Sequence, residues 1–86
     1  MYVIVAYDVN KKRVKKVLKI CRKYLTRVQN SLFEGHITDS NLSALKKELS
    51  SVIAFNKDTI CIYHMNSTKH IFKEEIGVTP KKDVIV

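Results

Sequence analysis

The chain has 86 residues, 45% of them hydrophobic, and 16 lysines and arginines against eight acidic residues give a formal net charge of +8. This length suits a single domain over residues 1–86 with a small core that dimerisation often supplements, and the two glycines and one proline argue against disorder. No apolar run approaches a membrane span and no signal peptide precedes the first apolar run, so we expect a cytoplasmic protein without a membrane partner.

The first predicted element is a strand over Met1–Asp8, an apolar run rich in β-branched and aromatic residues that ends at a carboxylate. Such a run suits a strand buried on both faces better than a helix. Asp8 would then lie at the carboxyl edge of a central strand, where a sheet can expose functional groups. The alternative is a turn or helix-capping aspartate. We expect Tyr7 to pack rather than react.

A basic helix is predicted over residues 11–24, with Asn10 as its cap. Five apolar positions follow helical spacing and share one face: Val14, Val17, Leu18, Cys21 and Leu25. Six cationic side chains occupy the opposite arc: Lys12, Lys15, Lys16, Lys19, Arg22 and Lys23. Arg13 lies at the border between the two arcs, and we expect it to be the basic residue best placed to work with Asp8.

The charge is concentrated in the first third of the chain. Residues 1–30 hold nine lysines and arginines against Asp8 alone, a sum of +8, whereas residues 31–86 hold seven charges of each sign. Like charges on one helix face repel, so this face would gain from an anionic partner. A concentrated basic surface on a small domain indicates a polyanion site, most often for nucleic acid. The alternative is a solvated helix face.

The rest of the chain predicts one more helix and several strands. Residues 26–37 are predicted as one strand, with Arg27 early, Phe33 late and an irregularity at 29–31. Capping candidates at 38–40 begin a structural helix that reaches Val52. The remaining predicted segments are a turn at 55–58, a strand at 59–64, a loop at 66–69, a strand at 70–76, a turn at 78–82 and a terminal strand at 83–86. That terminal strand is expected to pair with a sheet edge of this or another subunit.

Together these elements predict an α+β domain of ferredoxin-like βαββαβ order with an extra C-terminal strand. Its antiparallel sheet would carry both helices on one face. The other face must then be solvated or covered by a partner.

Asp8 also suggests a chemistry. One carboxylate per chain becomes a pair across the two-fold axis of a homodimer, and such a pair could hold Mg²⁺, or Mn²⁺, and activate a water against a phosphodiester. The three histidines are scattered and the two cysteines isolated, so we expect no zinc site and reduced thiols. No phosphate-binding loop or covalent-catalysis motif is present.

Several of these features together resemble one known family. They are Tyr7-Asp8 at the end of the first strand, Asn10, Arg13 with the basic helix, and the block from Arg27 to Gly35, RVQNSLFEG. The combination resembles the CRISPR-associated endoribonuclease family, small spacer-acquisition proteins that partner the CRISPR integrase. The match extends from Met1 to about Tyr63.

This resemblance implies a prokaryotic protein that forms a homodimer with its two sheets face to face. The dimer would lie between two dimers of the integrase subunit in a heterohexameric adaptation complex that captures foreign DNA. Asp8 matches the catalytic, metal-binding aspartate of the family. Tyr7, Arg13, Arg27 and Phe33 match positions associated with nuclease function or nucleic-acid contact.

Three functional hypotheses follow. The first is a metal-dependent endonuclease that acts on RNA or duplex DNA within the adaptation complex. The second is a non-catalytic scaffold that bridges integrase dimers and grips DNA by its backbone. The third, a ferredoxin-fold regulator that binds small molecules, fits the basic helix poorly. For the first two, the residues expected to contact nucleic acid are Lys12, Arg13, Lys15, Lys16, Lys19 and Arg27.

Overall fold

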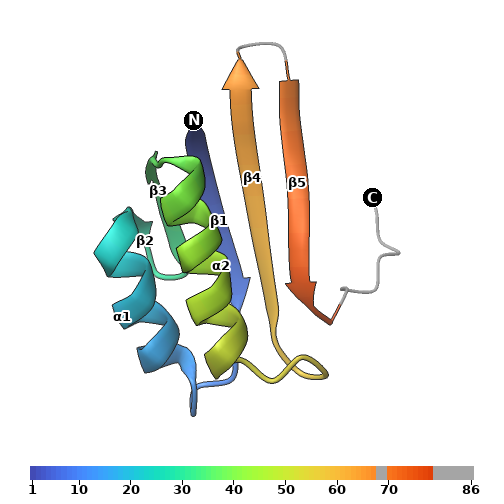
Figure 1. Ribbon diagram of the computed structural model, residues 1–86. Coiled ribbons are helices and arrows are strands. Elements are labelled where there is room, and N and C mark those ends of the chain that lie inside the picture. The colour runs from blue at the N-terminus through green and yellow to red at the C-terminus, as the bar shows by residue number, and fades with distance from the viewer. Residues whose placement is uncertain (68–69, 79–86) are drawn as a thin grey trace.

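The computed structural model describes residues 1–67 and 70–78, which form a five-stranded sheet with two helices on one of its faces (Figure 1). The elements are β1 (Tyr2–Asp8), α1 (Val14–Tyr24), β2 (Thr26–Gln29), β3 (Leu32–His36), α2 (Asp39–Val52), β4 (Thr59–Ser67) and β5 (His70–Gly77). The strand order is β2-β3-β1-β4-β5, and every neighbouring pair is antiparallel.

The predicted α+β class and βαββαβ order are therefore confirmed. β5, predicted at 70–76, extends that order and pairs with the outer side of β4. The predicted terminal strand at 83–86 lies outside the described residues, and so does the 78–82 turn apart from Val78.

The predicted single strand over 26–37 is wrong, because this segment folds as a hairpin of β2 and β3. Asn30 and Ser31 form its turn, and the register of the pair shifts between Arg27 and Gln29. Asparagine and serine favour turns because their side chains hydrogen-bond the local backbone. The hairpin places β3 beside β1, and the backbone N–H of Tyr7 donates to the carbonyl of Ser31 at 3.1 Å.

The first helix begins three residues later than predicted, at Val14 rather than Lys11. The Asn10 side chain accepts a hydrogen bond from the backbone N–H of Lys12 at 2.9 Å, and the Asn10 carbonyl accepts from Arg13 at 2.8 Å. Asn10 therefore closes a turn ahead of the helix instead of capping the helix itself. Arg13 occupies the capping position and makes no side-chain capping bond.

The apolar face predicted for this helix is confirmed. Val17, Cys21 and Leu25 are buried, and Val14 and Leu18 pack partly against the core. Ile20 was not part of the predicted face, but it is also buried, because α1 packs on α2 as well as on the sheet. Burial raises the pKa of the Cys21 thiol to about 12, which fits an unreactive core cysteine.

The second helix is capped as predicted. The Thr38 hydroxyl oxygen accepts from the backbone N–H of Asn41 at 3.1 Å, and the helix begins at Asp39. Leu42, Leu45 and Leu49 lie on the buried side of this helix and belong to the core. α2 is therefore a structural element, as its apolar spacing predicted.

The core lies between the helices and one face of the sheet. In β1 the buried side chains alternate: Val3, Val5 and Tyr7 face the helices. Phe33 in β3 lies opposite Val5 and is fully buried. Because side chains alternate along a strand, the other positions of β1 point to the face without helices.

We call that second face the open sheet face. The strand register places eleven described side chains of β1, β3 and β4 on it: Tyr2, Ile4, Ala6, Asp8, Leu32, Glu34, His36, Thr59, Cys61, Tyr63 and Met65. Most of these are apolar, and all except Asp8 and His36 are only partly exposed. A second copy of the chain could cover this face.

β4 and β5 are longer than predicted and form a hairpin that reaches beyond the helix layer (Figure 1). In the part of the chain that the structure describes, no helix combines the length and apolar character needed to cross a membrane.

Candidate metal and nucleic-acid site

Asp8 is exposed and lies at the last position of β1, opposite Thr59 of β4. The residues preceding it fix its position, because the buried alternation of β1 turns Tyr7 toward the core and Asp8 toward the open sheet face. Within residues 1–67 and 70–78, no group of three histidine, cysteine or acidic side chains could hold a metal. A carboxylate oxygen is a ligand that suits Mg²⁺. A Mg²⁺ site at Asp8 would need further ligands that the described residues of one copy do not supply.

A shallow depression of about 350 Å³ lies beside Asp8. It spans the ends of β1, β4 and β5 and the turn that leads into β4. The lining residues are Ala6, Tyr7, Asp8, Lys57, Thr59, Cys61 and Val78. Asp8 and Lys57 bring opposite charges to one rim, so the depression could receive both a cation and an anion.

The rings of Tyr7 and Phe33 pack in the core beside this depression. Their rings stack with centroids 6.2 Å apart, and the Tyr7 hydroxyl donates to the carbonyl of Asn30 at 3.4 Å. Burial raises the pKa of Tyr7 above its ordinary value, which makes the phenol a poorer acid. Tyr7 touches the depression, but Phe33 has no exposed surface and supports the site only through packing.

Arg13 binds Asp58 rather than Asp8. Arg13 Nε donates to Asp58 Oδ2 at 2.6 Å, and Nη2 donates to Oδ1 at 2.9 Å. Asp58 also accepts from the backbone N–H groups of Asn10 at 3.1 Å and Ala54 at 2.8 Å. Asp58 is fully buried, and its hydrogen bond with Arg13 holds the pKa of the carboxyl far below its usual range.

The sequence predicts Asp58 in a turn, and its pairing with Arg13 was not predicted. Its partner lies 45 positions away, so no local pattern joins them. Arg13 was expected to work with Asp8, but its guanidinium instead pairs with Asp58. Contact of Arg13 with nucleic acid stays a prediction.

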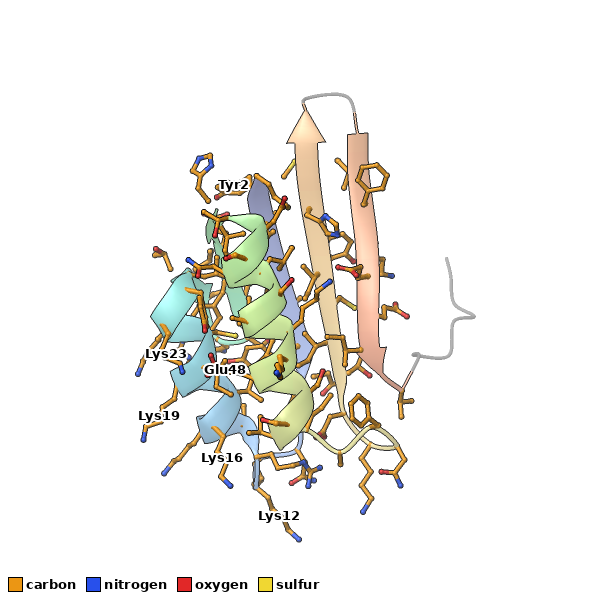
Figure 2. The ribbon with its side chains drawn as sticks, in the orientation of Figure 1. Tyr2, Lys12, Lys16, Lys19, Lys23 and Glu48 are labelled. Atoms are coloured by element: carbon orange, nitrogen blue, oxygen red, sulfur yellow. The ribbon has the colours of Figure 1, made fainter. Side chains whose placement is uncertain are left out.

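The cationic side chains of α1, together with Lys12 in the turn before it, form a ridge on the outside of the fold. Figure 2 shows Lys16, Lys19 and Lys23 pointing away from α1 on one side, and Lys12 extending from the turn that precedes this helix. These four residues are exposed, as are Lys15 and Arg22. We call the six residues the basic ridge.

The basic ridge borders a groove of about 500 Å³ between α1 and α2, whose floor includes Ile20 and Val52. One of its lysines has an internal partner: Lys23 binds Glu48 of α2, which also accepts from the hydroxyl of Tyr24. In the described residues the other five cations of the ridge have no carboxylate within ion-pair distance. They are therefore available to an anionic partner.

Arg27 is exposed on β2 and donates to the carbonyl of Asn30 at 3.2 Å. This bond ties it to the hairpin turn that also accepts from Tyr7. The structure thus brings Tyr7 and Arg27 to one turn, while Asp8 and the basic ridge lie on different parts of the surface.

The fold and these surfaces define a small ferredoxin-like domain with an exposed carboxylate, Asp8, at the end of its central strand and a strongly cationic helix. Residues 1–71 match the family described as CRISPR associated protein Cas2. The chain belongs to this family.

Relatives in bacteria and archaea match nearly the whole chain. The CRISPR-associated endoribonuclease Cas2 of Thermotoga maritima is 47% identical over 96% of this chain and 95% of its own length. The protein of the same name from Dictyoglomus turgidum is 42% identical over 95% of this chain and 94% of its own length. The CRISPR-associated endonuclease Cas2 of Halalkalibacterium halodurans is 39% identical over 98% of this chain and 94% of its own length.

Solved structures support the same assignment. A crystal structure of Streptococcus pyogenes Cas2 at pH 6.5 has a TM-score of 0.71 and 38% identity, and it covers 77% of this chain and 87% of that one. A second structure, described as a crystal structure of Cas2, has a TM-score of 0.75 and 34% identity over 100% and 94% of the two chains. The resemblance inferred from the YD and RVQNSLFEG segments is therefore confirmed.

Proposed function

We propose that this protein acts in CRISPR spacer acquisition as a homodimer that binds nucleic acid through its basic ridges and cleaves phosphodiester bonds with Mg²⁺. The observation that carries this proposal is the exposed Asp8 at the end of a central strand, in a family whose relatives are named endoribonucleases and endonucleases. Binding to DNA and bridging of integrase dimers are parts of the same proposal.

The open sheet face is the surface we assign to the homodimer. Its partly exposed apolar side chains include Ile4, Tyr63 and Met65, which lie side by side on β1 and β4. A small domain gains stability when such a face is covered. A two-fold axis near the end of β1 would bring the Asp8 carboxylates of both copies together.

The chain's own residues would divide the work. Asp8 of each copy supplies a carboxylate oxygen, the ligand type that Mg²⁺ prefers, and substrate phosphate and water complete the coordination. Mg²⁺ bound there would polarise the phosphodiester and lower the pKa of a bound water. The buried pair of Arg13 and Asp58 holds the turn that follows β1, and the basic ridge binds the backbone of the nucleic acid through its phosphates.

The alternative is a non-catalytic scaffold of the integration complex. The basic ridge supports this role as well, since phosphate contacts serve binding and cleavage alike. The two functions differ in what they require of Asp8: cleavage needs its carboxylate, whereas backbone binding does not.

The deciding experiment replaces Asp8 with asparagine, which keeps the size of the side chain and removes its charge. We expect the Mg²⁺-dependent cleavage of single-stranded RNA or duplex DNA to fall by more than about 100-fold, because a metal ligand is lost. Asp39→Asn, a change at another exposed carboxylate, should leave cleavage unchanged. Spacer uptake that persists in the Asp8→Asn variant would make cleavage dispensable, and wild-type protein without Asp8-dependent cleavage would favour the scaffold.

A further inference from the structure

We infer that Lys57 binds a phosphate of the nucleic acid substrate beside Asp8. This inference rests on the proposed function and adds to it a contact for the substrate. Lys57 lies in the turn between α2 and β4, outside the basic ridge, and it lines the same depression as Asp8 and Thr59.

The turn that carries Lys57 is firmly held. The backbone N–H groups of Lys57 and Asp58 both donate to the carbonyl of Ala54, at 2.9 and 2.8 Å. The buried Asp58 side chain then ties the turn to Asn10 and Arg13, the residues that follow β1. Lys57 is therefore fixed, at its backbone, relative to the strand end that bears Asp8.

The other side of the turn is fixed by β5. The backbone N–H of Val78 donates to the carbonyl of Asp58 at 2.9 Å, and the hydroxyl of Thr59 donates to the carbonyl of Val78. Val78 and Thr59 also line the depression. Three chain segments thus border the depression of about 350 Å³ that Asp8 and Lys57 line.

The Lys57 side chain is exposed and has no carboxylate within ion-pair distance in residues 1–67 and 70–78. A lysine ammonium is a compact charge on a flexible stem and commonly binds phosphate. A metal held by Asp8 would lie next to one phosphate oxygen, and Lys57 on the same rim could bind another oxygen or the neighbouring phosphate. Such a contact would aid binding and would stabilise charge that develops on the phosphate during cleavage.

The test compares three single variants: Lys57→Ala, Lys57→Arg and the control Lys47→Ala. Lys47 is also an exposed lysine without an ion pair, but it lies on α2 and does not line the depression. The probe is a short single-stranded RNA of fixed sequence. Its equilibrium affinity is measured by fluorescence anisotropy in the Asp8→Asn background, and kcat/KM for cleavage in Mg²⁺ is measured with Asp8 intact.

We expect Lys57→Ala to weaken RNA binding several-fold and to lower kcat/KM about tenfold, the effect of losing one charged hydrogen bond. Lys57→Arg should restore most of both, and Lys47→Ala should change neither. All variants should keep the wild-type melting temperature, since Lys57 makes no side-chain bond within the described residues. Equal RNA affinities of Lys57→Ala and Lys47→Ala would overturn the proposal, even if the protein proves inactive as a nuclease. If the wild-type protein shows no Asp8-dependent cleavage, the proposed nuclease function is overturned. The RNA-binding result then decides the role of Lys57.

Discussion

At the residue scale, the buried carboxylate of Asp58 holds in place the turns that lie next to the exposed carboxylate of Asp8. Its two oxygens accept four hydrogen bonds, from Asn10, Ala54 and twice from Arg13. These donors come from the turn after β1, the start of α1 and the turn before β4. A carboxylate without exposed surface is stable in its charged form only with such partners. The network therefore ties the turn that follows Asp8 to the turn before β4.

Replacing Arg13 with alanine should destabilise the fold, because it leaves Asp58 buried with only two backbone donors. We expect the melting temperature to fall by roughly 10 °C, measured by circular dichroism. Lys12→Ala is the matched control, since its side chain is exposed and only its backbone N–H is bonded. An Arg13→Ala variant as stable as Lys12→Ala would show that the pair adds nothing to stability.

The same pair gives the protein a characteristic dependence on pH. The pKa of Asp58 is lower in the folded than in the unfolded chain, chiefly because of Arg13, so the charged carboxylate stabilises the fold. That stabilisation is fully present above the unfolded pKa near 4 and is lost as the pH falls toward the folded value. In Arg13→Ala this part of the acid sensitivity should shrink, which urea unfolding between neutral and acid pH would measure.

Gly77 is a second residue that the arrangement requires. Its φ is +98°, and a Cβ there would lie 2.0 Å from the carbonyl oxygen of Asp58, so Gly77→Ala must displace the β5 backbone from the turn. We expect a loss of roughly 10 °C in melting temperature. Gly35→Ala is the comparison: Gly35 also has a positive φ, +157°, but its Cβ would meet only Leu25, the side chain at 3.4 Å and the Cα at 3.9 Å. A Gly77→Ala variant no less stable than Gly35→Ala would contradict the close approach of β5.

At the scale of elements, α1 separates two roles on one helix. Its inner side, with Val17 and Cys21, joins the core, and its outer side carries the basic ridge. Within the described residues only Lys23 of the ridge has an ion-pair partner, Glu48 on α2. The other five cations of the ridge form no ion pair within the described residues. Such unpaired positive charge is expected of a surface that binds phosphates.

Neutralising Lys12, Lys15 and Lys19 together to glutamine should flatten the salt dependence of nucleic-acid binding. Each lost phosphate contact lowers the slope of log affinity against log salt by about 0.7 to 0.9, so three contacts lower it by about two to three. The control with the same net charge replaces Lys46, Lys47 and Lys73, which lie on α2 and β5. Filter binding or anisotropy from low to high salt gives both slopes. An unchanged slope in the first variant would move the binding surface away from α1.

The elements also show what the sequence could predict. Helical spacing in both helices is a local pattern, and it predicted the buried positions Val17 and Leu45. The apolar run of β1 predicted burial on both faces, which is wrong, because Val3 and Val5 are buried and the residues next to them are partly exposed. The β2–β3 hairpin was missed because Asn30 and Ser31 interrupt a strand-like run by only two residues, which a bulge would explain equally well. Local composition could not choose between these conformations, whereas pairing of β3 with β1 decides it.

The candidate site also contains residues that the sequence could predict and contacts that it could not. Asp8 was predictable because it ends an apolar run, and the basic ridge because its charges repeat at helical spacing. The partnership of Arg13 with Asp58 and the placement of Lys57 beside Asp8 depend on contacts between segments more than 40 residues apart, 45 in the first case. No periodicity carries such information, so only the fold could supply it.

At the scale of the whole molecule, the proposed activity would depend on two chains, because one copy contributes only Asp8 to the proposed metal site. The described residues of one copy hold no group of three metal ligands, and the open sheet face beside Asp8 presents partly exposed apolar side chains such as Ile4 and Tyr63. A metal site completed across a two-fold axis would couple catalysis to assembly, because a monomer then has half of the ligands.

Mixing subunits tests this coupling directly. Wild-type and Asp8→Asn chains, carrying different affinity tags, are refolded together so that they assort at random, and cleavage is measured at each ratio. If both carboxylates are needed, only wild-type pairs cut, and an equal mixture keeps about a quarter of the activity because random pairing gives that share. If one carboxylate suffices, mixed dimers cut as well, and the equal mixture keeps at least about half. Doubly tagged heterodimers, purified by both tags, provide the decisive sample: activity in them would exclude a shared metal site, and its absence would place Asp8 of each copy on the same ion.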